Sequence, residues 1–190
     1  LVPATIMAWI LARKEFWGKS LLETLVFLPL VLPPVVPGYL LLQLFGNRGF
    51  FGQYLAPFGI EFAFNWKGAV LASIIVAFPL MVQPIRLSFQ LINQHLEQVA
   101  ATLGANPLRV FCSISLPLAI PGIIIGSILC FSRSLGEFGA TITFVGNIPD
   151  ETRTIPIAIY SLLQQPDGEQ MALRLVLLSL GLAFAALLAN

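Results

Sequence analysis

EQVAATLGANPLRVFCSISLP, residues 97–117, is the polar interruption around which this otherwise apolar chain is organised. Four apolar residues in and just before it lie at the spacing of one helix face: Leu96, Val99, Ala100 and Leu103. Gly104 follows them and Pro107 comes three residues later, which is the usual signal for the end of a helix. A new apolar run begins at Val110. The stretch therefore predicts a short amphipathic helix, a tight turn and a return into lipid.

The composition is that of a membrane protein. Hydrophobic residues make up 57% of the chain and charged residues only 10%, with a mean hydropathy of +0.89. Soluble domains carry about 25% charged residues. Backbone polar groups in lipid must be satisfied within their own segment, so the expected fold class is an all-α integral membrane protein. The net charge is +1 and the chain has no basic cluster, so nucleic acid is not expected as a partner. Membrane lipid is the expected partner.

Five apolar segments are predicted to be transmembrane helices within a single domain, 1–190. A crossing needs about 20 residues. The segments are 1–12, 21–45, 69–85, 112–132 and 171–190. The first looks truncated, because the chain starts without Met, and we expect it to be a piece of a longer protein. Residues 86–111 form the loop between the third and fourth spans.

Prolines interrupt the second predicted span at four positions: Pro29, Pro33, Pro34 and Pro37. Each interior proline removes a backbone donor and would cost about 3 kcal/mol in a water-soluble helix. The pattern predicts a broken or kinked helix. Such a helix can line a transport pathway, or it can be a rigid kink that only shapes the packing.

Arg133 and Glu137 lie at the end of the fourth segment, four residues apart, where the spacing of a helix face would let them pair. The pair can fix helix geometry, or Arg133 can supply positive potential to an anion path. Other candidates for the path or its mouth are hydroxyls and glycine N–H groups nearby: Ser134, Gly136, Gly139, Thr141 and Thr143. For each hydroxyl, hydrogen bonding within or between helices is the alternative.

The stretch at residues 97–117 resembles the "EAA" loop of bacterial ABC importer permeases. The four fixed positions of that motif are in register here, at Gly104, Ile114, Leu116 and Pro117. The Glu-Ala-Ala positions hold Gln98, Val99 and Ala100, and Glu97 lies one position early. The resemblance implies a type I ABC importer permease (MetI-like) helical bundle whose loop docks to a cytoplasmic ATP-binding subunit. The residues expected to couple to that subunit are Leu96, Glu97, Gln98, Val99, Ala100, Leu103, Gly104, Ala105, Pro107, Arg109, Ile114, Leu116 and Pro117. An interfacial helix without a partner is the alternative.

A second run, FSRSLGEFGATITF at 131–144, is similar to permeases for tetrahedral oxyanions. GNIPDETRTIP at 146–156 is similar to their molybdate branch in particular. Sulfate permeases share the Gly-Glu-Phe-Gly-Ala core. The resemblance therefore implies a molybdate importer permease, with tungstate or sulfate/thiosulfate as alternatives.

The chain contains no Gly-x-x-x-x-Gly-Lys-Ser/Thr phosphate loop, so ATP and Mg²⁺ are expected on the partner ATPase rather than here. One His and two Cys give no metal-ligand spacing, and we expect no bound cofactor, metal or catalytic residue. The resemblance also implies a periplasmic or surface oxyanion-binding protein. Five spans are few to enclose a conduit, which favours a homodimer. An ion-gradient-driven secondary transporter is the alternative of another class, but no internal repeat supports it.

The orientation follows from the loop and from charge. If the loop around Gly104 is cytoplasmic, five basic residues lie inside: Arg13, Lys14, Lys19, Arg86 and Arg109. Three lie in the external loops: Arg48, Lys67 and Arg153. This excess has the sign expected for the bacterial cytoplasmic (inner) membrane.

Overall fold

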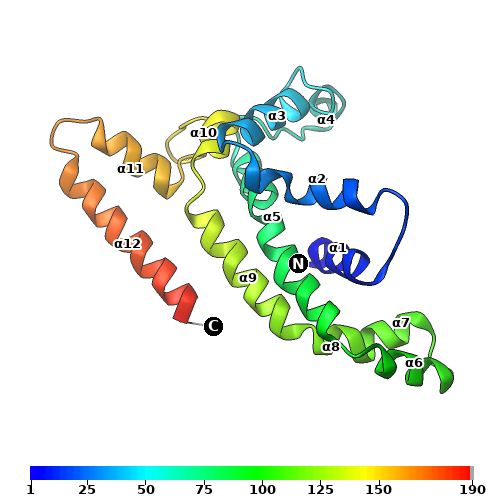
Figure 1. Ribbon diagram of the computed structural model, residues 1–190. Helices are drawn as coiled ribbons and strands as arrows, with labels where there is room; N and C mark the ends of the chain where they lie inside the picture. The colour runs from blue at the N-terminus through cyan, green and yellow to red at the C-terminus, as the bar shows by residue number, and fades with distance from the viewer. Residues whose placement is uncertain (189–190) are drawn as a thin grey trace. The chain divides into compact units, whose positions relative to one another are not determined.

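The computed structural model describes residues 1–188, and within them every regular element is a helix (Figure 1). The all-α fold class is thereby confirmed. The elements are α1 Val2–Arg13, α2 Lys19–Val31, α3 Val35–Phe45, α4 Gly52–Leu55, η1 Ala56–Phe58, α5 Trp66–Leu91, α6 Gln94–Thr102, α7 Pro107–Val110, η2 Phe111–Ser115, α8 Leu116–Leu118, α9 Ile120–Leu135, α10 Gly139–Val145, α11 Ile155–Leu163 and α12 Glu169–Leu188.

Among the described residues, two helices, α5 and α12, are individually long and apolar enough to cross a membrane. Two bent pairs pass the same test together, α2 with α3 and Pro107–Leu118 with α9, and α1 is a shorter apolar helix. These elements correspond to the five predicted segments. The end of the last one, residues 189–190, lies outside the described residues. Which segments cross the bilayer stays a prediction.

The predicted break in the second segment is present. The chain leaves helix between α2 and α3, where Pro33 and Pro34 follow each other, and the two helices are bent by 117°. Pro29, in contrast, is accommodated inside α2. The cause is local, because consecutive prolines remove two backbone donors and disfavour helix at the preceding residue.

The fourth segment is less regular than a single straight span. It begins with the π-helical turn η2, continues into α8 and bends by 64° before α9. Pro117 lies in α8 and Pro121 in the first turn of α9. Both prolines lack a backbone donor, so the regular ladder is interrupted where they enter it.

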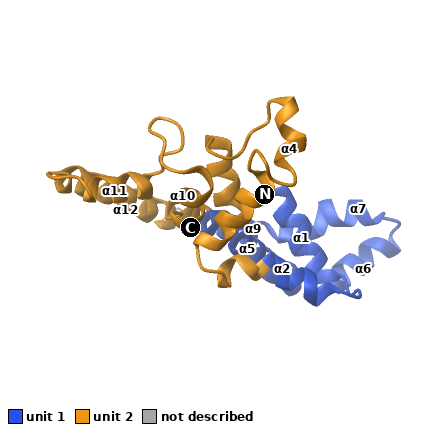
Figure 2. Cartoon of the chain, turned by 90° about the horizontal axis from the view of Figure 1, so that it is seen from above, with its two compact units in different colours: residues 1–26, 78–130, 190 blue, residues 27–77, 131–189 orange. Residues whose placement is uncertain are grey.

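The chain divides into two compact units, coloured separately in Figure 2. Unit 1 contains residues 1–26 and 78–130, and unit 2 contains residues 27–77 and the described residues from 131 onward. The core of unit 2 is a cluster on α3, α5 and α10, among them Leu41, Val76 and Phe144. Figure 1 shows α10 against α3 in this unit.

In unit 1, α5 and α9 lie side by side and approach through glycines (Figure 1). A Cβ on Gly126 would lie 2.7 Å from the carbonyl oxygen of Met81, and one on Gly122 would lie 2.6 Å from that of Pro84. Small residues let helix backbones approach in lipid, where packing rather than the hydrophobic effect stabilises helix pairs. The spacing of these two glycines is the small-xxx-small pattern.

We expect Gly126→Ala to lower the free energy of unfolding by about 1–3 kcal/mol, since the new methyl group meets rigid backbone. Gly181→Ala in α12 is the matched control, because nothing lies within 4 Å of its Cβ position. Thermal unfolding of the purified protein in detergent measures both. Equal stability of the two variants would show that the close approach of α5 and α9 is not required.

Candidate functional site

The loop around Gly104, residues 93–110, contains two capped helices joined by a glycine turn. Asn93 caps α6, its side chain accepting a hydrogen bond of 3.0 Å from the backbone N–H of His95. At the other end Gly104 adopts a left-handed φ of 87°, and the N–H of Ala105 donates to the carbonyl of Ala100 at 3.0 Å. These bonds form the Schellman pattern that ends a helix. The predicted helix and its glycine stop are confirmed.

A second cap starts the short helix that follows. The side chain of Asn106 accepts a hydrogen bond of 2.8 Å from the N–H of Arg109, and Pro107 occupies the first turn of α7. Both helices are therefore held by local backbone and cap bonds that the sequence specifies directly. The turn between them has a defined geometry.

The loop exposes its apolar side chains. Leu103 and Leu108 are 83% and 72% exposed, and Leu96 and Val99 are exposed as well. No residue of α6 is buried. Gln98, Pro107 and Arg109 are exposed, while Ala100 and Ala105 are half-buried. Exposed apolar side chains clustered on a polar loop are typical of a surface that a partner covers.

The rest of the predicted motif follows this loop in η2 and α8. Ile114 belongs to η2 and Leu116 to α8, both half-buried, and Pro117 is exposed. Glu97 differs from its neighbours in α6, because its carboxylate oxygen Oε1 lies 3.1 Å from Nη2 of Arg13 at the end of α1. Sequence reasoning missed Arg13 as a partner of this loop. A lone acid in a polar loop carries no signal of a distant arginine.

The second candidate site is the ion pair at the end of α9. Nη1 of Arg133 lies 2.7 Å from Oε2 of Glu137, so the predicted pairing is confirmed. The predicted reason was wrong, since α9 ends at Leu135 and Glu137 lies in the linker before α10 rather than on the same helix.

Glu137 also caps the next helix. Its Oε1 accepts a hydrogen bond of 2.7 Å from the N–H of Ala140 in the first turn of α10, and the side chain is only 2% exposed. A buried carboxylate at a helix N-terminus satisfies an otherwise unpaired donor and interacts favourably with the helix dipole. The geometry favours the interpretation that the pair fixes the junction of α9 and α10.

Two of the three hydroxyls proposed for the transport path already make hydrogen bonds. Thr141 donates to the carbonyl of Phe138 at 2.9 Å, and Thr143 donates to that of Gly139 at 2.8 Å. Gly139 lies against Pro34, where an added Cβ would come within 2.5 Å of the proline Cβ. Ser134 is half-buried and Gly136 is exposed. The structure therefore favours local hydrogen bonding to the backbone at the start of α10 for the two threonines.

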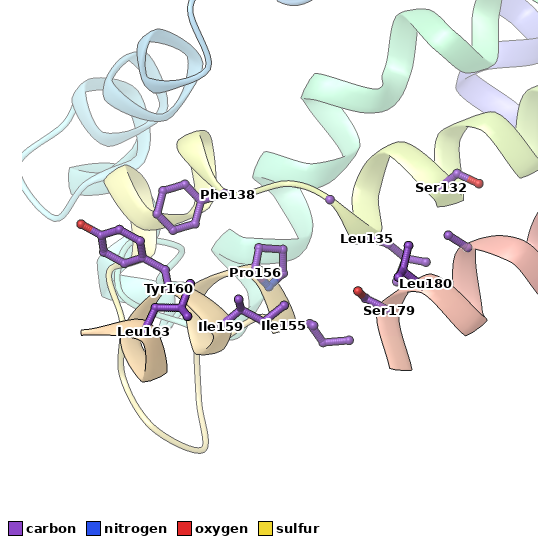
Figure 3. Close-up of a pocket in the computed structure, with 12 residues that line it drawn as sticks. Ser132, Leu135, Phe138, Ile155, Pro156, Ile159, Tyr160, Leu163, Ser179 and Leu180 are labelled. Carbon is purple, nitrogen blue, oxygen red and sulfur yellow. The ribbon is translucent and has the colours of Figure 1, made fainter. Parts of the chain in front are cut away.

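An apolar cavity of about 520 Å³ lies in unit 2 and has Gly136 in its lining (Figure 3). It is lined by the end of α9, by α11 and by α12, with the rings of Phe138 and Tyr160 packed 5.2 Å apart at one side. None of the residues lining it is charged. Such a cavity offers no counter-charge to a doubly charged anion. Within residues 1–188 no group of three His, Cys, Asp or Glu side chains could hold a metal ion.

These features are those of a helical, apolar chain, with helices long enough to cross a membrane and an exposed loop around Gly104. The chain belongs to the family of binding-protein-dependent transport system inner membrane components, which matches residues 4–190. This confirms the resemblance to ABC importer permeases.

The relatives are similar along most of the chain. This chain is 59% identical over 182 residues to the molybdenum transport system permease protein ModB of Escherichia coli (strain K12). The matched residues cover 95% of this chain and 80% of that protein. Identity is 57% to ModB of Haemophilus influenzae, over 97% of this chain and 81% of that protein. The sulfate transport system permease protein CysT of Escherichia coli (strain K12) is 39% identical, over 85% of this chain and 58% of that protein.

The fold is similar to that of a solved bacterial ABC transporter involved in the import of the acidic polysaccharide alginate. The TM-score is 0.65 at 16% identity, covering 97% of this chain and 68% of that one. At this identity the similarity concerns the fold alone.

We expect Glu137→Ala to lower the free energy of unfolding by about 3 kcal/mol. The change leaves the backbone N–H of Ala140 without an acceptor and Arg133 without its counter-charge. Glu137→Gln keeps an oxygen acceptor for the N–H of Ala140 and should cost clearly less. Chemical unfolding in detergent measures both. If both variants unfold like the wild type but lose transport, the pair acts on the transported anion instead.

Proposed function

We propose that this chain is the permease subunit of an ATP-driven importer for molybdate. The observation that carries the proposal is the 59% identity to a molybdenum transport permease over 95% of the chain, against 39% for a sulfate transport permease. The motif GNIPDETRTIP at 146–156 points to the same branch. Tungstate and sulfate/thiosulfate are the alternative cargoes.

ATP hydrolysis takes place on a separate cytoplasmic subunit. The chain has no phosphate loop of its own, so ATP and Mg²⁺ bind to that partner. The exposed apolar residues of α6 and the following turn, with Leu103 the most exposed, dock into a groove of the ATPase. Closure of the ATPase moves the docked helix and shifts the permease between inward-facing and outward-facing states.

The remaining partners follow from the class of transporter. The family is binding-protein-dependent and of the inner membrane, which supports a periplasmic or surface oxyanion-binding protein and a location in the bacterial cytoplasmic membrane. Two copies of the permease enclose the conduit between them. The apolar cavity within unit 2 of a single copy is lined by no charged residue that could receive an anion. An ion-gradient-driven carrier is disfavoured by membership of this family.

We expect Leu103→Asp to abolish ATP-dependent transport and to weaken binding of the ATPase by about 10-fold or more, since it places an unpaired charge in an apolar contact. Leu103→Met is the matched control and should retain both ATP-dependent transport and binding of the ATPase. Co-purification of the ATPase and uptake by proteoliposomes measure the effect. Wild-type coupling in Leu103→Asp would contradict the docking role of this loop.

The cargo is tested by uptake of labelled molybdate in cells that lack their own oxyanion permeases and carry this permease with its ATPase and binding protein. We expect uptake that depends on ATP hydrolysis and persists in about 100-fold excess sulfate, because the match to molybdenum permeases is the stronger one. Labelled sulfate and tungstate are the parallel arms. Preferential uptake of sulfate would assign the chain to the sulfate branch.

A further inference from the structure

Helix α6 is held to the rest of unit 1 by polar contacts more than by packing. None of its residues is buried, so apolar burial contributes little to its position. A cavity of about 400 Å³ lies between it and the end of α1, lined among others by Arg13, Glu97 and Ser115. The position of α6 therefore depends on the groups that bridge this space.

A single carboxylate oxygen makes that bridge. Oε1 of Glu97 accepts hydrogen bonds from Nη2 of Arg13 at 3.1 Å and from the hydroxyl of Ser115 at 2.7 Å. The three residues come from α6, α1 and the end of η2. Charge-assisted hydrogen bonds of this kind are shorter and stronger than neutral ones.

Arg13 holds the start of α6 as well as its first turn. Its Nη2 also donates to the carbonyl of Ile92 at 3.2 Å, directly before the cap residue Asn93. The Arg13 side chain is only 8% exposed, so its charge is almost removed from solvent and requires the carboxylate. Its place in the last turn of α1 is favourable for a cation.

Ser115 is fixed from the other side. It is buried at the end of η2, whose Phe111 packs against Trp9 of α1 at 5.7 Å and against Phe89 of α5 at 6.2 Å between ring centroids. The hydroxyl therefore approaches Glu97 from an element anchored to two helices of unit 1. The π-helical turn is the kind of local distortion that often occurs at functional positions.

We propose that Arg13 and Ser115 are positioning residues that tie the docking helix α6 to α1 through Glu97, so that displacement of α6 by the ATPase is transmitted to α1. The proposal rests on the proposed function. It assigns Glu97 an internal role, in contrast to the exposed apolar residues of α6, which contact the ATPase. Loss of the contacts among Arg13, Glu97 and Ser115 leaves binding of the ATPase intact, but movement of α6 is then no longer transmitted to α1.

The test uses the full-length permease with its ATPase and binding protein in proteoliposomes. Arg13→Gln and Glu97→Gln should keep the ATPase bound in wild-type amounts, while molybdate transported per ATP hydrolysed falls about 10-fold. The exchange Arg13→Glu with Glu97→Arg should restore most of this ratio. Glu23→Gln is the matched control, because it breaks the Arg86–Glu23 pair in the same unit without touching α6.

A distance measurement tests the tie without using activity. Spin labels at the exposed positions Ile6 of α1 and Gln98 of α6 should give one narrow distance distribution in the wild type. Glu97→Gln should broaden the distribution, and the charge exchange should narrow it again. Glu23→Gln should leave it unchanged.

Three results would overturn the proposal. Wild-type transport per ATP in both single variants would show that the tie carries no coupling. Loss of ATPase binding as in Leu103→Asp would make Glu97 a docking contact instead. An unchanged distance distribution in Glu97→Gln would show that the pair does not position α6. Absence of ATP-driven uptake in the wild type itself would instead overturn the proposed function, and this inference with it.

Discussion

The structure depends on one constraint, which is that a backbone in lipid must make its hydrogen bonds within the protein. The apolar chain meets this constraint with helices, which leave backbone groups unpaired at their ends and where prolines interrupt them. Such places need cover from neighbouring groups. At the junction before α10 the buried carboxylate of Glu137 supplies it, accepting from the N–H of Ala140 and pairing with Arg133. The charge of Glu137 would be costly in lipid. Its position is explained by the backbone N–H at the start of α10 that it accepts a hydrogen bond from.

The same constraint decides how the helices pack. Lipid is as apolar as leucine, so helix pairs are stabilised by close contact rather than by exclusion of water. Glycines permit this contact at Gly126 against α5 in unit 1 and at Gly38 against α10 in unit 2. Helix α6 lies outside this regime. It has no buried residue, and hydrogen bonds from Arg13 and Ser115 fix its position.

The sequence predicted features that local chemistry specifies. The limits of α6 follow from the cap Asn93 and from Gly104, and the break after α2 follows from adjacent prolines. Features that depend on distant partners could not be predicted. Arg13 and Glu97 are 84 positions apart, and no periodicity links them. Helical spacing suggested the correct partner for Arg133 for the wrong reason, because the helix ends before Glu137.

The candidate transport residues bear on how cargo is selected. A doubly charged oxyanion needs donors that other groups do not already occupy. Arg133 is paired with Glu137, and the hydroxyls of Thr141 and Thr143 donate to nearby backbone carbonyls at the start of α10. Strong binding at these groups would also hinder release. Under the proposed function, we therefore expect these groups to contribute little to the selection of the anion.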